Sequence, residues 1–150
     1  MSWTRRAFIS ALVAAPTGAA YARLIEPRWL EVRRLEVRIP GASLTAPLRL
    51  LHVSDLHATD AASLNYLERA LETGLAEQPD LIVATGDFIT ALFDAWPAYR
   101  RLLARLSAAA PTFACLGNHD GGEWSATHGG YRLPWTMAEC LVSAGIRLLD

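Results

Sequence analysis

The chain has 150 residues, which is enough for one domain with a hydrophobic core of its own. Its composition, 52% hydrophobic and 19% charged, is that of a globular protein and excludes a disordered one. Its 14 basic residues, all arginine, face 15 acidic ones, so the sequence offers no basic surface for nucleic acid and no nucleic-acid binding is predicted. The two cysteines, Cys115 and Cys140, indicate buried thiols, and a disulfide stays open for an exported chain.

Residues 1–22 have the order of parts of an export signal. An arginine pair, Arg5 and Arg6, precedes a mild apolar stretch at residues 7–15 and then Ala-Tyr-Ala at residues 20–22. Residues 4–9, Thr-Arg-Arg-Ala-Phe-Ile, resemble the twin-arginine export motif. We therefore expect the twin-arginine machinery to carry the protein to the periplasm or the outer face of the membrane. The alternative is an uncleaved amphipathic helix or N-terminal anchor, which would leave the domain associated with the membrane.

The rest of the chain alternates apolar runs with amphipathic segments. Residues 23–28 are expected to be a linker and residues 29–150 one domain. Leucines at 64, 67, 71 and 75 have helical spacing. Alternating buried strands and helices indicate an α/β fold whose central sheet is parallel. The expected elements are an exposed or edge strand at 29–39, a strand buried on both faces at 48–54, a helix at 61–77 capped by Asp60 or Ser63, a buried strand at 80–87, a helix at 94–110 capped by Asp94, a buried strand at 112–120, a loop at 121–135, a helix from 136, and a strand at 146–149.

Polar side chains follow the three buried strands. The first strand ends in Asp55-x-His57, whose side chains would point the same way on an extended chain. The second ends in Gly86-Asp87, and the third in residues 117–120, Gly-Asn-His-Asp. Because ligands of open α/β sheets bind beyond the carboxyl ends of the strands, these groups are expected to form one site. Their oxygen and imidazole donors suit Mn, Fe, Zn or Mg; helix capping is the alternative for each aspartate taken alone.

Together these motifs resemble the calcineurin-like metallophosphoesterases, and in particular an exported bacterial branch with a twin-arginine leader. The resemblance covers about residues 30–150. It implies the N-terminal half of a β-sandwich flanked by helices, in the order β-α-β-α-β-α-β after an initial edge strand. The site residues that the resemblance implies are Asp55 and His57 on a first metal, Asp87 bridging two metals, Asn118 on the second, and His119 as a general acid oriented by Asp120.

The resemblance also implies a function. The expected activity is metal-dependent hydrolysis of a phosphomonoester or phosphodiester by a hydroxide that bridges two divalent or trivalent metal ions. The substrate would be a small molecule or a lipid, and the export signal favours a lipid or cell-envelope phosphoester. Aromatic residues at 124, 131 and 135 in the glycine-rich loop would cover a lipid or nucleotide group, or would simply pack the loop.

The chain departs from the family pattern in two ways. Thr90 stands where the family's GDxxD motif has its second aspartate, and the family's later histidine motifs are missing. The remaining histidines are His52, expected in the core, and His128, expected at the surface or facing substrate. We therefore expect the N-terminal half of a longer protein. The alternative is a truncated, noncatalytic fragment or binding module that keeps the fold; a Rossmann-type nucleotide binder lacks the G-x-G-x-x-G motif.

Overall fold

The structure, a computed structural model, describes residues 21–23, 29–41, 46–59 and 63–149. The chain divides into two compact units, residues 1–34 and residues 35–150. Residues 21–23 are helical. The rest of the predicted export signal and most of the predicted linker lie outside the described residues. Within the described ranges, no helix has the length and apolar character needed to cross a membrane.

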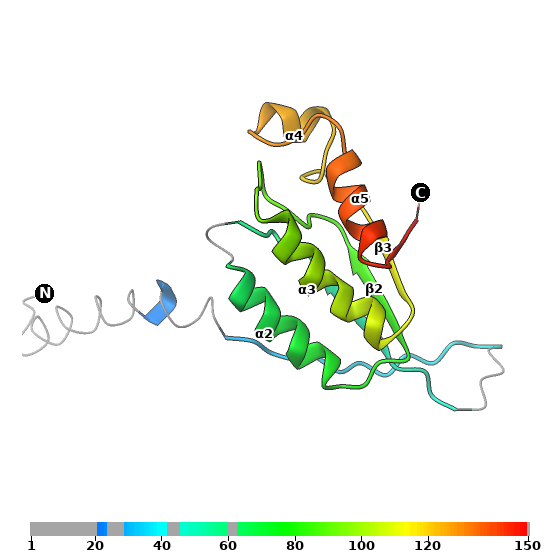
Figure 1. The fold of residues 1–150 in the computed structure, drawn as a ribbon. Coiled ribbons are helices and arrows are strands. Elements are labelled where there is room, and N and C mark those ends of the chain that lie inside the picture. Colours follow the sequence, from blue (N-terminus) through cyan, green and yellow to red (C-terminus); the bar gives the residue numbers. More distant parts are fainter. Residues whose placement is uncertain (1–20, 24–28, 42–45, 60–62, 150) are drawn as a thin grey trace, which may run out of the picture. The chain divides into compact units, whose positions relative to one another are not determined.

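Four parallel strands form the sheet of the second unit, in the order β1-β2-β3-β4. They alternate along the chain with helices, which confirms the predicted α/β class (Figure 1). The strands are β1 (Leu50–Ser54), β2 (Leu81–Thr85), β3 (Thr112–Cys115) and β4 (Arg147–Leu148). The helices are α2 (Leu64–Leu75), α3 (Trp96–Ala109), α4 (Glu123–Thr127) and α5 (Trp135–Ser143).

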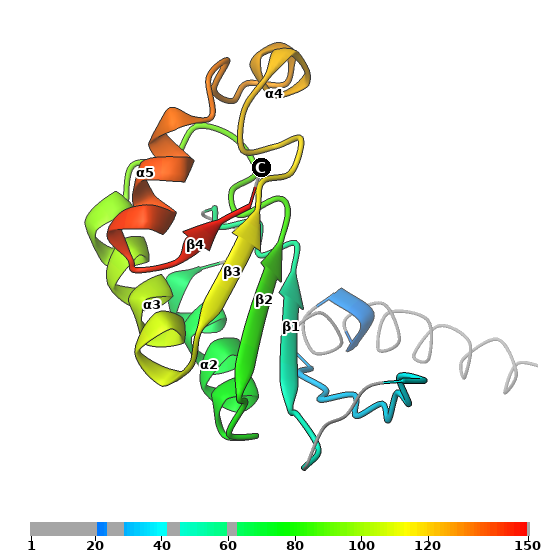
Figure 2. The same ribbon diagram turned by 90° about the vertical axis from the view of Figure 1, so that its right-hand side faces the viewer.

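Helices α2, α3 and α5 lie on one face of this sheet (Figure 2). The helical spacing of the leucines explains the contact of α2, because Leu67 and Leu71 are buried at its inner face. Gly74 of the same helix leaves room for Leu51 of β1, since a Cβ at Gly74 would lie 3.0 Å from a Leu51 methyl carbon. The core therefore lies between this helical layer and the inward-pointing residues of the strands.

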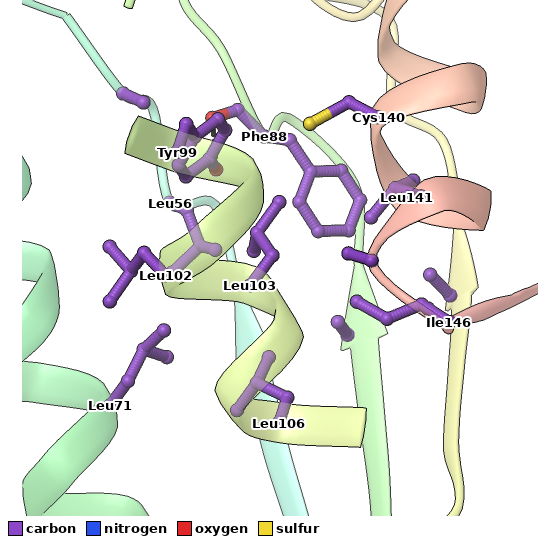
Figure 3. Packing of buried hydrophobic residues seen from close by; sticks show 14 of the residues in the cluster. Leu56, Leu71, Phe88, Tyr99, Leu102, Leu103, Leu106, Cys140, Leu141 and Ile146 are labelled. Carbon is purple, nitrogen blue, oxygen red and sulfur yellow. Dashed lines mark hydrogen bonds between the residues drawn. The ribbon is translucent and has the colours of Figure 1, made fainter. Parts of the chain in front are cut away.

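Phe88, just beyond β2, lies at the centre of the core. Its ring packs among Leu103 of α3 and Cys140 and Leu141 of α5 (Figure 3). The buried hydroxyl of Tyr99 donates a 2.8 Å hydrogen bond to the carbonyl of Phe88, so the segment after β2 is fixed to α3. Burial raises the pKa of Tyr99 well above its usual value, and the nearby Asp120 carboxylate adds to the effect.

The prediction that the strands are buried on both faces is wrong. Within the described part of the second unit, helices cover only one face, so alternate residues of β1 and β2 remain exposed or half-buried on the other. His52, expected in the core, points to this second face; it is exposed, and its Nε2 lies 2.7 Å from the Thr85 hydroxyl. Cys115 of β3 is also exposed, whereas Cys140 is buried, and both are free thiols. Burial raises the pKa of the Cys140 thiol to about 11.

Three local predictions also need correction. Residues 29–39 form no strand, and the apolar side chains of Leu35, Val37 and Ile39 are largely exposed rather than paired against a neighbour. Helix α3 begins after Ala95, not Asp94, and makes no side-chain capping bond. The predicted loop at 121–135 contains the five-residue helix α4, which is too short to show a helical hydrophobic periodicity in the sequence.

Candidate metal centre

The segments that follow β1, β2 and β3 are hydrogen-bonded to one another beyond the carboxyl ends of the strands. The amide of His57 donates to the Asp87 carbonyl at 2.8 Å, and the amide of Gly86 donates to the Cys115 carbonyl at 2.9 Å. A further parallel bridge joins Ala58 to Ile89. The three polar motifs are therefore held side by side, in the region where α4 lies (Figure 2).

The backbone at these positions is unusual. Asp55, His57 and Asp87 have φ values of 52°, 43° and 45°, and they are three of the four non-glycine residues with positive φ in the described part of the chain. This conformation costs a residue with a Cβ about 1–3 kcal/mol and is concentrated at functional sites. Asp55 and His57 are therefore not two residues of an extended strand, and the prediction that they point the same way for that reason is wrong.

His57, Asp87 and His119 come together in one group. Each offers a ligand atom, and these atoms all lie within 4.8 Å of one another. The Nε2 of His57 is 3.8 Å from Oδ2 of Asp87, too far for a hydrogen bond, and the two imidazole rings meet edge to face at 4.7 Å. All three residues are partly buried. Two imidazole nitrogens around a carboxylate, without a thiolate, fit Mn, Fe or Zn.

Asp87 is fixed by its second oxygen. Oδ1 accepts a 2.9 Å hydrogen bond from the amide of His119, which leaves Oδ2 on the side of His57. Gly117 makes this approach possible, because a Cβ there would lie 2.2 Å from Oδ1 of Asp87. The glycine that opens the third motif is thus required by the carboxylate that ends the second.

The other predicted ligands, Asp55 and Asn118, have exposed side chains at the same edge of the sheet. The amide of Asp55 donates to the Thr85 carbonyl at 3.3 Å, which places the residue directly beyond β1. Its carboxylate does not belong to the group formed by His57, Asp87 and His119 among the described residues. Metal ligation by Asp55 and Asn118 stays a prediction.

Asp120 does not make the contact with His119 that the resemblance implied. Its side chain is buried, and Oδ1 accepts hydrogen bonds from the amides of Phe88 and Ile89, while Oδ2 accepts one from the amide of Gly117. Burial raises the pKa of Asp120 above its usual value, although these three bonds act in the opposite direction, and the Asp87 carboxylate raises it further. In this arrangement Asp120 joins the segments that carry Asp87 and His119.

Thr90, and not Asp120, contacts the His119 ring. Its carbonyl oxygen lies 2.8 Å from Nδ1 of His119, and its hydroxyl lies 3.2 Å from Nδ1 of His57. The only sign of this residue in the sequence is its position, four residues after Gly86, where the family's motif has an aspartate. A threonine there carries no chemical signal by itself.

Helix α4 adds aromatic side chains beside the group. The ring centroid of Trp124 lies 4.3 Å from that of His119, and the His128 ring stacks on Trp124 with centroids 4.1 Å apart and the two planes nearly parallel. Nδ1 of His128 also lies 2.7 Å from the Trp124 carbonyl. His128 is exposed, and it lies against Trp124 rather than within the group of ligand atoms.

A sequence model of the calcineurin-like phosphoesterase family matches residues 48–147, a range that contains every residue of the site. The chain belongs to this family. As a calcineurin-like phosphoesterase, it is 34% identical over 152 residues to the phosphodiesterase YaeI of Escherichia coli, covering 97% of this chain and 53% of YaeI. It is 36% identical over 116 residues to the UDP-2,3-diacylglucosamine pyrophosphatase LpxG of Chlamydia muridarum, covering 75% of this chain and 35% of LpxG.

Among solved structures, this calcineurin-like phosphoesterase is similar to the nuclease MPE of Pseudomonas putida, with 22% identity and a TM-score of 0.45. That comparison covers 68% of this chain and 48% of the nuclease. The chain thus spans about half the length of YaeI and of the nuclease, and a smaller share of LpxG.

Proposed function

We propose that the protein is a metal-dependent phosphoester hydrolase with a binuclear site, acting on a phosphodiester or phosphomonoester. The observation that carries the proposal is the group of His57, Asp87 and His119, whose ligand atoms gather on three adjoining strand ends. Its membership of the calcineurin-like phosphoesterase family and its likeness to a named phosphodiesterase support the same reaction class.

The side chains divide the work between them. Metal ions held by His57, Asp87 and, as the resemblance implies, Asp55 and Asn118 would supply a hydroxide nucleophile near neutral pH and neutralise phosphoryl charge. Asp87 is suited to a shared position because its Oδ1 is already fixed to the His119 amide and Oδ2 remains available. The Nδ1 of His119 donates to the Thr90 carbonyl, which leaves Nε2 free of that contact. In the imidazolium form, which carries a hydrogen on both ring nitrogens, His119 would give its Nε2 hydrogen to the leaving alkoxide, a step that contributes about 10²–10⁴-fold.

The hydrolysis test uses the protein at the full length its gene encodes. After removal of metal with a chelator, we expect no hydrolysis of bis(4-nitrophenyl) phosphate or 4-nitrophenyl phosphate, and restored hydrolysis of at least one on adding Mn²⁺. Their relative kcat/KM values distinguish a diesterase from a monoesterase. Calorimetric Mn²⁺ binding without hydrolysis of either ester would instead favour the noncatalytic binding module.

We further propose that the substrate is a lipid or cell-envelope phosphoester and that the protein is exported through its twin-arginine-type leader. Apolar side chains are exposed around the site: Leu92 is 68% exposed, Leu133 is 57% and Trp124 is 41%. Backbone hydrogen bonds from Leu92 to Gly129 and from Gly122 to Arg132 connect these loops to α4. The named pyrophosphatase relative acts on a diacylated sugar nucleotide, and an apolar rim of this kind suits acyl chains.

Replacing two of these leucines tests the lipid proposal. A Leu92→Ser/Leu133→Ser double variant is expected to raise KM for a micellar diacyl phosphoester about 30-fold, because two lost apolar contacts of order 1 kcal/mol each sum to about 2 kcal/mol. Its KM for 4-nitrophenyl esters should stay unchanged. Val142→Ser, which alters an exposed apolar side chain on α5, serves as the matched control. An equal KM in the double variant and the wild type would argue against an acyl-binding rim.

A further inference from the structure

Thr90 contacts both histidines of the site through two different atoms. Its hydroxyl oxygen is 3.2 Å from Nδ1 of His57, and its carbonyl oxygen is 2.8 Å from Nδ1 of His119. The two rings lie edge to face with their centroids 4.7 Å apart. Thr90 therefore contacts Nδ1 of each of two histidines, which follow different strands.

The chemistry of each contact determines which ring nitrogen carries a hydrogen. A carbonyl oxygen only accepts, so Nδ1 of His119 must donate, and Nε2 of the neutral ring keeps its lone pair. The Thr90 hydroxyl oxygen also lies 3.4 Å from the His57 carbonyl, to which it can donate its single hydrogen, and in that arrangement the oxygen accepts from Nδ1 of His57. In this arrangement both imidazoles have the same tautomer, with the hydrogen on Nδ1.

That tautomer is the one a metal centre needs. With Nδ1 protonated, the lone pair of Nε2 on His57 faces Oδ2 of Asp87 across a 3.8 Å gap that no hydrogen bond bridges. A metal-bound histidine commonly donates its other ring N–H to an oxygen in this way, and the donation fixes the ring's orientation. Thr90 supplies that oxygen to His57 with its side chain and to His119 with its backbone.

The fold holds Thr90 independently of the histidines. The two residues before it, Phe88 and Ile89, donate their amides to Oδ1 of the buried Asp120. Ile89 also pairs with Ala58, and the Ala58 amide donates to the Phe88 carbonyl at 2.9 Å. Because these bonds fix the preceding backbone, the position of Thr90 does not depend on its contacts with the two imidazoles.

We propose that Thr90 is a positioning residue which sets the tautomer and orientation of His57 and His119 together. The hydroxyl prepares His57 to bind metal, and the carbonyl prepares His119 to face the phosphoryl group. The second half of this inference rests on the proposed hydrolase function, whereas the tautomers are properties of the metal-free protein.

Thr90→Val separates the two contacts, because valine has the same shape, keeps the carbonyl and lacks the hydroxyl. In the metal-free protein labelled with ¹⁵N-histidine, above about pH 8 where imidazoles are neutral, long-range ¹H–¹⁵N spectra report each tautomer. We expect His57 and His119 to be protonated at Nδ1 in the wild type. In Thr90→Val, His57 should become a mixture of tautomers while His119 keeps its proton at Nδ1.

The chain offers a matched control and a rescue. Thr85→Val removes an equivalent threonine–histidine hydrogen bond, that with His52 on the helix-free face of the sheet, and should alter the His52 signals alone. Thr90→Ser keeps the hydroxyl and should restore the wild-type pattern at His57. A loss of folding would instead change the signals of all four histidines.

Metal binding gives the second readout. Losing an oxygen partner behind a metal-bound histidine typically weakens affinity about 10–100-fold, and we expect that loss in Thr90→Val by Mn²⁺ calorimetry, with near-wild-type affinity in Thr90→Ser.

Three results would overturn the inference. The first is a single Nδ1-protonated His57 in Thr90→Val, and the second is a His57 protonated at Nε2 in the wild type. The third is a tautomer change in Thr90→Val with unchanged Mn²⁺ affinity. A wild-type protein that binds Mn²⁺ but hydrolyses no ester would refute the proposed reaction, while the tautomer and affinity measurements would still support the role of Thr90.

Discussion

An Asp87→Asn variant is expected to lose phosphoester hydrolysis by about 10³-fold while keeping its fold. Asparagine has the shape of aspartate, and its amide oxygen can still accept the hydrogen bond that Oδ1 of Asp87 receives from the His119 amide. What disappears is the negative charge between His57 and His119, the group best placed to bind metal. Metal stabilisation of phosphoryl charge is worth several kcal/mol, and about 4 kcal/mol corresponds to that loss of rate.

The measurement is kcat/KM for a nitrophenyl phosphoester at a series of Mn²⁺ concentrations, together with Mn²⁺ calorimetry. Asp80→Asn is a matched control, because Asp80 lies at the other end of β2 and its Oδ2 accepts the Arg49 amide at 2.8 Å. That variant should keep its activity. If Asp87→Asn and Asp80→Asn hydrolyse the ester equally well, Asp87 does not bridge metals.

The gathering of the site could be predicted from the sequence because it depends on strand order. Apolar runs that end in polar residues, separated by amphipathic helices, place their carboxyl ends at one edge of a parallel sheet. His57, Asp87 and His119 do lie together there, as expected. The leucine spacing of α2 likewise predicted its buried face, since helical periodicity is a local property of the sequence.

The contacts within the site could not be predicted in the same way. The left-handed backbone of Asp55 and His57 arises where β1 ends and the chain turns toward Asp87, and no residue pattern in the sequence predicts it. Thr90 contacts the two histidines through a backbone carbonyl, which every residue has, and a hydroxyl, which every threonine has. These contacts depend on loops 30 or so residues apart, so they follow from tertiary packing and not from local preference.

The apolar pattern of the strands also could not predict which of their side chains are exposed. The run from Leu50 to Ser54 contains three apolar residues, and its residues alternate between the helix-covered face and the other face. His52 was therefore expected in the core and lies on the second face, hydrogen-bonded to Thr85. A strand's apolar character says that a face can be buried; which elements cover it is a property of the whole fold.

Asp120→Asn is expected to destabilise the protein by about 3 kcal/mol, although it is the smallest change available at that position. The carboxylate accepts amide hydrogens on both oxygens, from Phe88 and Ile89 on Oδ1 and from Gly117 on Oδ2. An asparagine amide can accept on one side only, and its NH₂ group must then face a backbone N–H. A buried donor left without an acceptor costs about 1–3 kcal/mol, and loss of a charged partner adds to this.

Urea unfolding followed by circular dichroism measures the free-energy difference between Asp120→Asn and the wild type. Asp94→Asn is the control, because Asp94 is exposed and makes no capping bond to α3, so its unfolding midpoint should match the wild type. A difference below about 0.5 kcal/mol for Asp120→Asn, the range of ordinary surface substitutions, would contradict the structural role of the carboxylate. The same three bonds join the segment after Asp87 to the segment that carries His119. Loss of one of them in Asp120→Asn should therefore also make local unfolding of the site easier than unfolding of the whole domain.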